Sequence, residues 1–255
     1  MIALVALKPV PDPEAVPRVG GDGITPELLD PRWVANPFDD VALEAAVQWR
    51  EAGALSAVVA VCVGDDTGVG VLRTALAQGA DRAVWVHAPA LPSPDWVVGA
   101  LAAVARREAA RLVLLGRQGV DGDRGCTAPA LATLLGWPLG SFVTALLPVG
   151  EGLGAGIQVT REVEGGSERR QLALPAVLSA DLRWVTPRHP SLPAILRARG
   201  KPLESLKDLD LGERSPVRGG QRVALSPPPA RPRGERVATV AAFLRHMRQR
   251  GVLTG

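Results

Sequence analysis

Apolar runs without alternation recur along the first part of this 255-residue chain. Residues 57–63 (AVVAVCV) and 111–115 (RLVLL) carry almost no polar side chain, and residues 2–7 and 83–86 give shorter runs of the same kind. A strand with one solvated face alternates polar and apolar positions, whereas an unbroken apolar run is typical of a strand buried on both faces. We therefore predict four strands in the interior of a sheet.

Stretches with helical spacing of apolar positions separate these runs. In residues 38–52, Phe38, Val41 and Trp49 recur near helical spacing, and Gly53 ends the pattern. The predicted helices span residues 38–52, 71–78, 95–110 and 128–135. Because helices alternate with strands, the sequence predicts an α/β fold with a doubly wound, mostly parallel sheet.

The pattern changes after Gly140. Residues 157–163 and 169–174 are predicted to form a small β-hairpin joined at Gly165-Gly166, and residues 177–180 rejoin the sheet. Residues 184–233 are rich in Pro, Gly and Arg without a clear period, so we expect an extended C-terminal arm that wraps a partner subunit or is mobile. Residues 236–250 show the spacing of an amphipathic helix. The chain is accordingly divided into three parts, residues 1–183, 184–235 and 236–255.

Composition excludes several classes of protein. An apolar share of 47% and a charged share of 22% indicate a globular chain, and no apolar run approaches the roughly 18 residues of a membrane span. The net charge of +3 is too small for a general nucleic-acid binder, and the spacing of three histidines and two cysteines excludes a Cys/His zinc site. With no signal-peptide pattern and only two cysteines, we expect a cytoplasmic protein without membrane insertion.

Ligands of open parallel sheets bind beyond the carboxyl ends of strands, where residues 6–13, 63–66 and 116–127 are expected. The last of these segments (GRQGVDGDRGCT) lies between a buried strand and a helix, and its four glycines allow a ligand to approach the backbone. Free N–H groups at the start of the helix would form an anion site, which a nucleotide phosphate would fill. The alternative is an ordinary loop in which Asp121 and Asp123 cap the helix.

Catalytic groups are not evident in the sequence. No serine or cysteine lies in a GxSxG elbow, Cys126 is most simply a structural thiol near a helix start, and Asp39 and Asp40 are typical first-turn acids. ATP-hydrolysing or adenylating α/β proteins need a serine-rich phosphate loop after the first strand, where this chain has Lys8-Pro9-Val10-Pro11. We therefore predict a nucleotide binder or carrier that is not an enzyme, with a purely structural module as a further alternative.

Several segments, in this order, together resemble one family, the β subunits of electron-transfer flavoproteins. The segments that carry the resemblance are VALKPVPD (5–12), NPF (36–38), RTALAQGADR (73–82), the loop at 116–127, GWP (136–138), REVEGG (161–166), LPAV (174–177), SADLR (179–183) and SLPAILRA (191–198). The resemblance implies a heterodimer with an α subunit that holds most of one FAD. This FAD would take electrons from flavin dehydrogenases, such as the acyl-CoA dehydrogenases of fatty acid β-oxidation, and pass them to a membrane quinone oxidoreductase.

The resemblance also implies that the β chain binds AMP as a structural nucleotide, or a second FAD in bifurcating members of the family. Ala6 and Val63 would meet the adenine, and Phe38 would approach the flavin. Asn36, Pro37, Phe38 and Asp39 would close over the nucleotide. The implied phosphate cradle comprises Gly116, Gln118, Asp121, Asp123, Arg124, Gly125, Cys126 and Thr127. Pro13 stands where some members of the family place an aromatic residue near the flavin.

A recognition loop for the dehydrogenase is implied at residues 191–201. Leu192 would be its apolar anchor, with Pro193 and Ile195 beside it, and Arg197 would steer an acidic partner surface. From composition alone, a solvated, arginine-rich linker is the favoured interpretation of this segment.

Overall fold

A computed structural model describes residues 1–28, 31–88, 92–150, 156–207, 223–231 and 233–253. The chain forms two compact units, one of Met1–Pro17 with Leu28–Gln221 and one of Arg18–Glu27 with Arg222–Gly255. Residues 208–222 and 232 of the expected arm lie outside the described residues. Among the described residues, no helix is both long and apolar enough to cross a membrane.

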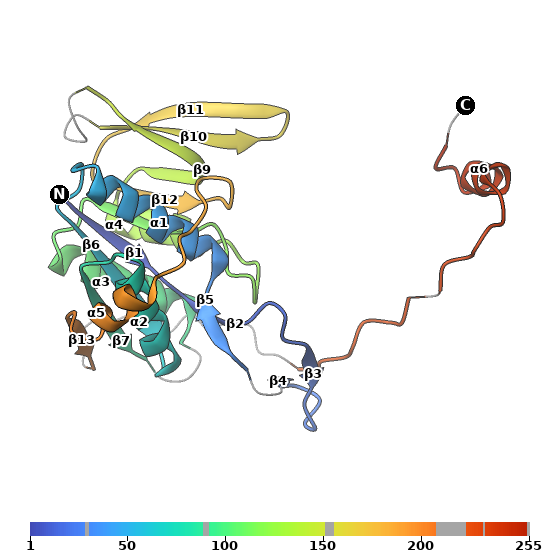
Figure 1. Ribbon diagram of the computed structural model, residues 1–255, viewed down its shortest axis with the longest axis horizontal. Coiled ribbons are helices and arrows are strands. Elements are labelled where there is room, and N and C mark those ends of the chain that lie inside the picture. The colour runs from blue at the N-terminus through green and yellow to red at the C-terminus, as the bar shows by residue number, and fades with distance from the viewer. Residues whose placement is uncertain (29–30, 89–91, 151–155, 208–222, 232, 254–255) are drawn as a thin grey trace. The chain divides into compact units, whose positions relative to one another are not determined.

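One mostly parallel sheet dominates the first unit (Figure 1). Nine strands of the described chain form it, in the order β11-β10-β9-β12-β8-β1-β6-β7-β13. Neighbours from β9 to β13 in this order run parallel, whereas β10 is antiparallel to β9 and β11 to β10. The bounds are β1 Ile2–Ala6, β6 Ala57–Gly64, β7 Arg82–His87, β8 Leu112–Gly116, β9 Leu139–Pro148, β10 Ile157–Val163, β11 Gly166–Leu172, β12 Ala176–Ala180 and β13 Leu203–Leu206. The predicted α/β class, with its small hairpin addition, is confirmed.

Helices cover both faces of this sheet, which explains the unbroken apolar runs. Val5 of β1 belongs to the core under α1 (Pro37–Glu51) and α2 (Thr67–Gln78). Its neighbour Leu4 belongs to the core under α3 (Pro94–Arg107) and α4 (Thr127–Leu135). Successive residues of a strand point to opposite faces, so a strand with a helix layer on each side must be apolar at every position.

Local signals fix the ends of these helices. Pro37 occupies the first turn of α1, where its missing N–H is no loss. The Ser93 side chain caps α3 by accepting a hydrogen bond from the N–H of Trp96. α4 ends at Gly136, whose φ of +68° is in the left-handed region that favours glycine.

The structure contains elements that the sequence pattern did not predict. β9 is a ten-residue strand in a segment for which we predicted none, and residues 184–207, expected to be irregular, contain α5 (Leu192–Ala198) and β13. β2 (Pro9–Pro11) pairs with β5 (Trp33–Ala35) in a region for which we predicted no strand. The hairpin turn consists of Glu164 and Gly165, one residue earlier than predicted.

The second unit holds most of a short ribbon and the C-terminal helix. The ribbon pairs β3 (Pro17–Val19) with β4 (Pro26–Leu28). α6 spans Val240–Gln249, inside the predicted helix, and Thr239 caps it by accepting a hydrogen bond from the N–H of Ala242. No residue of α6 is buried, and its large apolar residues Val240, Phe243 and Leu244 are exposed.

Candidate functional site

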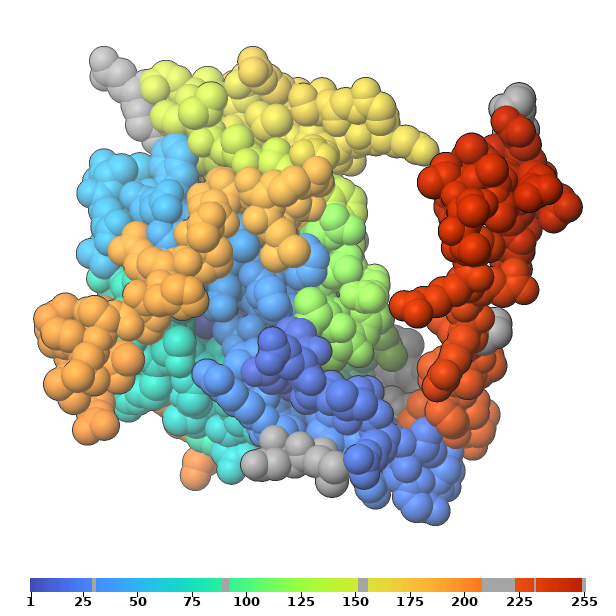
Figure 2. Space-filling model, turned by 45° about the vertical axis from the view of Figure 1, so that its right-hand side comes forward, coloured from blue at the N-terminus to red at the C-terminus, as the bar shows by residue number. Residues whose placement is uncertain are grey.

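The strand order reverses between β1 and β8. From β1 the chain proceeds through β6 and β7 in one direction, and then returns to β8, β12 and β9 on the other side of β1. Ligands of doubly wound sheets bind in the crevice outside the carboxyl ends of the strands at such a point. Here the crevice is bounded by the residues that follow β1, the start of α1 and the loop after β8. Figure 2 shows the green surface of the chain around this loop beside the blue surface of the N-terminal segments.

Asp39, in the first turn of α1, ties together the two strands that flank the crevice. Its Oδ1 accepts a hydrogen bond from the backbone N–H of Gly116 at 2.6 Å, and its Oδ2 accepts one from the N–H of Lys8 at 2.8 Å. Only 5% of the residue is exposed, and burial raises the pKa of Asp39 to about 7 in spite of the two N–H donors, which favour the carboxylate. Asp39 therefore forms the floor of the crevice.

Asn36 fixes the loop after β8. Its Nδ2 donates to the carbonyl oxygen of Gln118 at 2.9 Å, and its Oδ1 accepts from the N–H of Val120 at 3.1 Å. The Asn36 side chain is only 1% exposed, and it links two segments that lie more than 80 positions apart in the chain.

The glycines of the loop have different physical roles. A Cβ on Gly116 would lie 2.5 Å from both Asp39 Oδ1 and Phe38 Cβ, so this glycine makes room for the protein's own packing. A Cβ on Gly122 would meet nothing within 4 Å, and Gly125 has a φ of +59°. Gly122 therefore leaves open space beside the backbone, and Gly125 has a conformation that glycine favours.

The two aspartates of the loop are engaged away from the start of α4. Lys8 Nζ lies 2.6 Å from each carboxylate oxygen of Asp121, and Gln118 Nε2 donates to Asp123 Oδ1 at 2.9 Å. The residue at the N-cap of α4 is Cys126, which makes no capping hydrogen bond through its side chain. The alternative in which the aspartates cap this helix is therefore wrong.

The start of α4 offers donors without protein acceptors. Within the described part of the chain, no backbone N–H of residues 124–128 donates a hydrogen bond. Lys8 neutralises the carboxylate of Asp121 in this loop, and the first turn of a helix carries a partial positive charge. These donors fit an anion such as a phosphate. The exposed Arg124 adds a cation beside them.

An apolar surface lies on the same side of the sheet as these donors. Ala6 at the end of β1 and Val63 near the end of β6 both belong to the core layer under α3 and α4. Val63 is half-buried, whereas Ala6 is 8% exposed. The two residues expected to meet the adenine thus lie toward the carboxyl ends of their strands, on the face of the sheet that α4 also covers.

An arginine between two aromatic rings borders the crevice. The guanidinium carbon of Arg117 lies 5.6 Å from the ring centre of Phe38 and 4.9 Å from that of Phe142. It donates to Asp181 Oδ2 at 2.9 Å, and although burial opposes the charge of Asp181, hydrogen bonds from Arg183 and Arg117 hold its pKa below the usual value. Phe38 is 8% exposed and Phe142 is 38% exposed with a φ of +56°, so Phe142 is the ring that solvent reaches.

Sequence reasoning missed this cluster. Arg117 lies inside the loop we singled out, but Phe142 and Asp181 come from β9 and the residue after β12. A cavity of about 260 Å³ adjoins them, lined by Arg117, Phe142, Glu162, Val163, Glu164, Asp181 and Arg183. The only signal in the sequence was an aromatic residue in a segment without a clear pattern.

The residues of the predicted recognition loop lie elsewhere on the first unit, on α5. Leu192 is 68% exposed, and Pro193, Ile195 and Arg197 are also exposed or half-buried. Ala198 is the one buried residue of this helix and belongs to the core under α1 and α2. The structure therefore does not join α5 to the crevice, but presents it as a separate surface.

Comparison with known proteins gives consistent matches. Residues 29–211 match the family described as the electron transfer flavoprotein domain. The chain is 39% identical to the electron transfer flavoprotein subunit beta of Bradyrhizobium diazoefficiens over 212 residues, 83% of this chain and 84% of the relative. It is 36% identical to the subunit beta of Sus scrofa, over 98% of this chain and 97% of the relative, and 35% identical to that of Homo sapiens, over 97% of each.

Proposed function

Since this chain belongs to the electron transfer flavoprotein family, as a beta subunit, we propose that its crevice binds AMP as a structural nucleotide and that the chain completes the site of an FAD held mainly by an alpha subunit. Members of this family are subunits of an electron carrier. The prediction of a carrier subunit, and not a catalyst, is thereby confirmed.

The unpaired N–H groups at the start of α4 carry the proposal for AMP. The phosphate would accept hydrogen bonds from residues 124–128 and from the hydroxyl of Thr127, while Ala6 and Val63 would contact the adenine. Lys8 holds Asp121 as an ion pair, which removes a charge that would repel the phosphate. A second FAD is the alternative occupant, because the open space at Gly122 and the charge of Arg124 would also suit a diphosphate.

Release of nucleotides from the heat-denatured heterodimer, followed by mass spectrometry, tests this proposal. One AMP and one FAD per heterodimer is the expected result. Two FAD molecules would favour the alternative, and FAD without AMP would leave the crevice with a structural role only. The isolated beta chain should be nearly colourless, and AMP should raise its melting temperature.

Electron transfer requires cofactors that are close together and shielded from water. FAD supplies the redox chemistry, since it accepts and donates electrons singly or in pairs. The residues of this chain would orient it and exclude water from one side. Arg117, fixed by Asp181 and packed between Phe38 and Phe142, supports this role because it places a held cation and an accessible ring at the edge of the crevice.

The exposed face of α5 supports a role in docking. Leu192 is an apolar side chain that the first unit leaves exposed, and Arg197 and Arg199 would attract an acidic surface. We assign this face to flavin dehydrogenases such as acyl-CoA dehydrogenases, with a membrane quinone oxidoreductase as the electron acceptor of the complex. The arm at residues 184–233 would wrap the alpha subunit.

A further inference from the structure

We propose that Arg188 and Lys201, with Arg73 of α2, are positioning residues that hold the docking helix α5 in its binding orientation before a partner arrives. This inference rests on the docking function proposed above for α5. A helix of seven residues has little stability of its own, and α5 buries only Ala198. Its orientation therefore depends on its packing against α2 and on the polar contacts at its two ends.

The C-terminal ends of α2 and α5 are capped by each other's side chains. Arg73 of α2 donates through Nη1 to the carbonyl oxygens of Ala198 and Lys201, each at 3.1 Å. In return, Lys201 donates through Nζ to the carbonyl oxygens of Leu76 at 2.9 Å and Ala80 at 2.7 Å. The last carbonyl groups of a helix lack intrahelical donors and carry a partial negative charge. A cation at the C-terminal end of each of these two helices therefore supplies both a hydrogen-bond donor and a compensating charge. The exchange fixes the end of α5 against α2.

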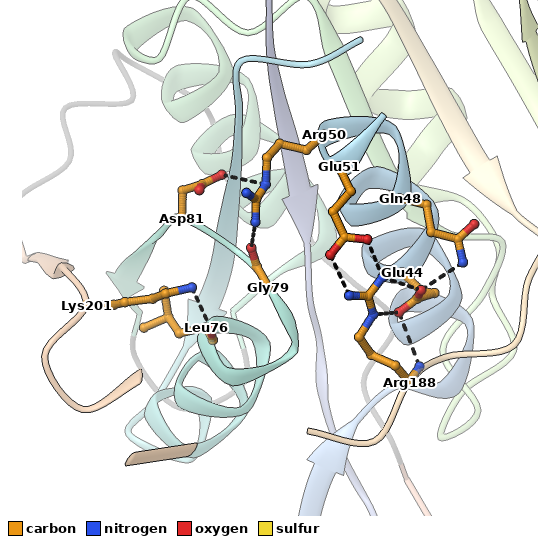
Figure 3. Close-up of polar contacts among 9 residues, drawn as sticks. All are labelled: Glu44, Gln48, Arg50, Glu51, Leu76, Gly79, Asp81, Arg188 and Lys201. Carbon is orange, nitrogen blue, oxygen red and sulfur yellow. Dashed lines mark hydrogen bonds and ion pairs between the residues drawn. The ribbon is translucent and has the colours of Figure 1, made fainter. Parts of the chain in front are cut away.

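Arg188 fixes the chain ahead of α5 through two carboxylates of α1 (Figure 3). Its Nε and Nη2 donate to the two oxygens of Glu44 at 2.8 and 2.9 Å, and its Nη1 and Nη2 donate to those of Glu51 at 2.7 and 2.9 Å. Glu44 also accepts a hydrogen bond from the backbone N–H of Arg188. Such paired, planar contacts restrict orientation as well as distance.

The segment 188–201 is thus held at both ends, and α5 lies between them with Leu192 outward. Figure 2 shows orange surface of this part of the chain beside cyan surface, which belongs to the region that includes α2. A preorganised loop loses less conformational freedom on binding, so its affinity for a partner is higher than that of a free loop with the same side chains. Arg188 and Lys201 should therefore affect docking and not the redox step that follows.

The choice of cation at each anchor supports this reading. Lysine occurs at only three positions of the chain, among 29 basic residues, yet the residue between the carbonyls of α2 is a lysine. A compact ammonium suits two converging carbonyl oxygens, whereas the fork of Arg188 needs a guanidinium to reach two carboxylates. Arg188→Lys and Lys201→Arg therefore keep the charge but lose the contact geometry.

The test uses the heterodimer with its FAD, varied in concentration as the electron acceptor of a purified acyl-CoA dehydrogenase at saturating acyl-CoA. We expect Arg188→Lys and Lys201→Arg to raise the KM for the heterodimer by about 3- to 10-fold while kcat, FAD content and reduction by dithionite stay unchanged. Arg106→Ala on α3, beneath the other face of the sheet, is the matched control and should leave KM unchanged. In the free heterodimer, the amide hydrogens of residues 192–198 should exchange faster in both positioning variants.

A double-mutant cycle with Leu192→Ala separates this inference from the docking function. If the anchors act through α5, the effect of Lys201→Arg on KM should largely disappear in the Leu192→Ala background. The positioning role would be overturned if KM is unchanged in both positioning variants, or if the effects of Lys201→Arg and Leu192→Ala on KM are fully additive. In either case, a raised KM in Leu192→Ala would still support the docking function. An unchanged KM in Leu192→Ala itself would overturn the docking function and this inference with it. If either Arg188→Lys or Lys201→Arg loses FAD, the KM and the amide exchange of the other variant decide whether the positioning role holds.

Discussion

The carboxylate of Asp39 receives the backbone N–H of Gly116 at 2.6 Å, across a separation of 77 positions in the chain. This one contact joins the start of α1 to the end of β8, and the second oxygen of Asp39 does the same for the residues after β1. The reversal of strand order leaves these chain ends diverging, and Asp39 closes the gap beneath the crevice. The crevice that we propose as the nucleotide site is thus supported from beneath by the hydrogen bonds of Asp39.

Replacement of Asp39 by Asn should change how stability depends on pH. Burial raises the pKa of Asp39 to about 7, above its value in the unfolded chain, so the folded protein binds this proton more tightly. The stabilisation from this proton is full below the unfolded pKa of about 4 and is lost as the pH rises to about 7. The free energy of unfolding of the native chain, minus that of Asp39→Asn, should therefore fall between pH 4 and pH 7 and level off above it. Urea titrations at several pH values measure the difference, and a constant difference would contradict the prediction.

Below about pH 4, where Asp39 is protonated in both states, the same variant should be less stable than the native chain. An Asn side chain has one acceptor oxygen for two N–H donors, so one buried donor loses its partner, at about 1–3 kcal/mol. Asp40→Asn, at the next position of α1, is a useful comparison because its carboxylate receives neither of these two N–H groups.

Two glycines of the loop after β8 should respond differently to alanine. In Gly116→Ala, the new Cβ meets Asp39 Oδ1 and Phe38 Cβ at 2.5 Å, and such overpacking costs about 1–3 kcal/mol. In Gly122→Ala, the Cβ points into open space and the backbone has no positive φ, so stability should change by less than about 0.5 kcal/mol. Thermal or urea unfolding of the two variants measures the contrast, and equal effects would show that the loop adjusts.

Unbroken apolar runs were sufficient to predict β1, β6, β7 and β8, because strands covered on both faces carry their burial in their own sequence. β9 was missed because part of it is exposed and its pairing with β12 and β10 is set by distant residues. α5 and β13 were missed because each is too short for a periodic signal and depends on packing against α2 and on pairing with β7.

The candidate site shows the same division. The position of the loop after β8 and its free donors followed from the succession of strand, glycines and helix. The partners of its side chains did not, since Lys8 and Asp121 lie 113 positions apart and Asn36 reaches Gln118 over 82. Local patterns predict where an element begins and ends, but not which side chain meets it from another part of the chain.

An aspartate at the N-cap of α4 should compete with the phosphate. In Cys126→Asp, a carboxylate is added at the positive end of α4, which should stabilise the chain by about 0.3–1 kcal/mol. The same negative charge repels a phosphate and occupies its donors, so the affinity for AMP should fall by about tenfold or more. Calorimetric titration of AMP and thermal unfolding test both effects. Cys126→Asn adds no charge and should retain more affinity than Cys126→Asp, whereas undiminished binding in Cys126→Asp would place the phosphate elsewhere.

Leu192→Ala should separate docking from folding. Because Leu192 is 68% exposed, its truncation removes little buried area and should change the free energy of unfolding by less than about 0.5 kcal/mol. If a partner pocket buries this side chain, the lost contact should weaken docking by about 1.5–3 kcal/mol and raise the KM for the heterodimer about tenfold or more. Leu147→Ala, another exposed leucine on β9, is the matched control and should leave KM unchanged. Loss of the alpha subunit from Leu192→Ala, seen by gel filtration, would instead identify α5 as an assembly contact.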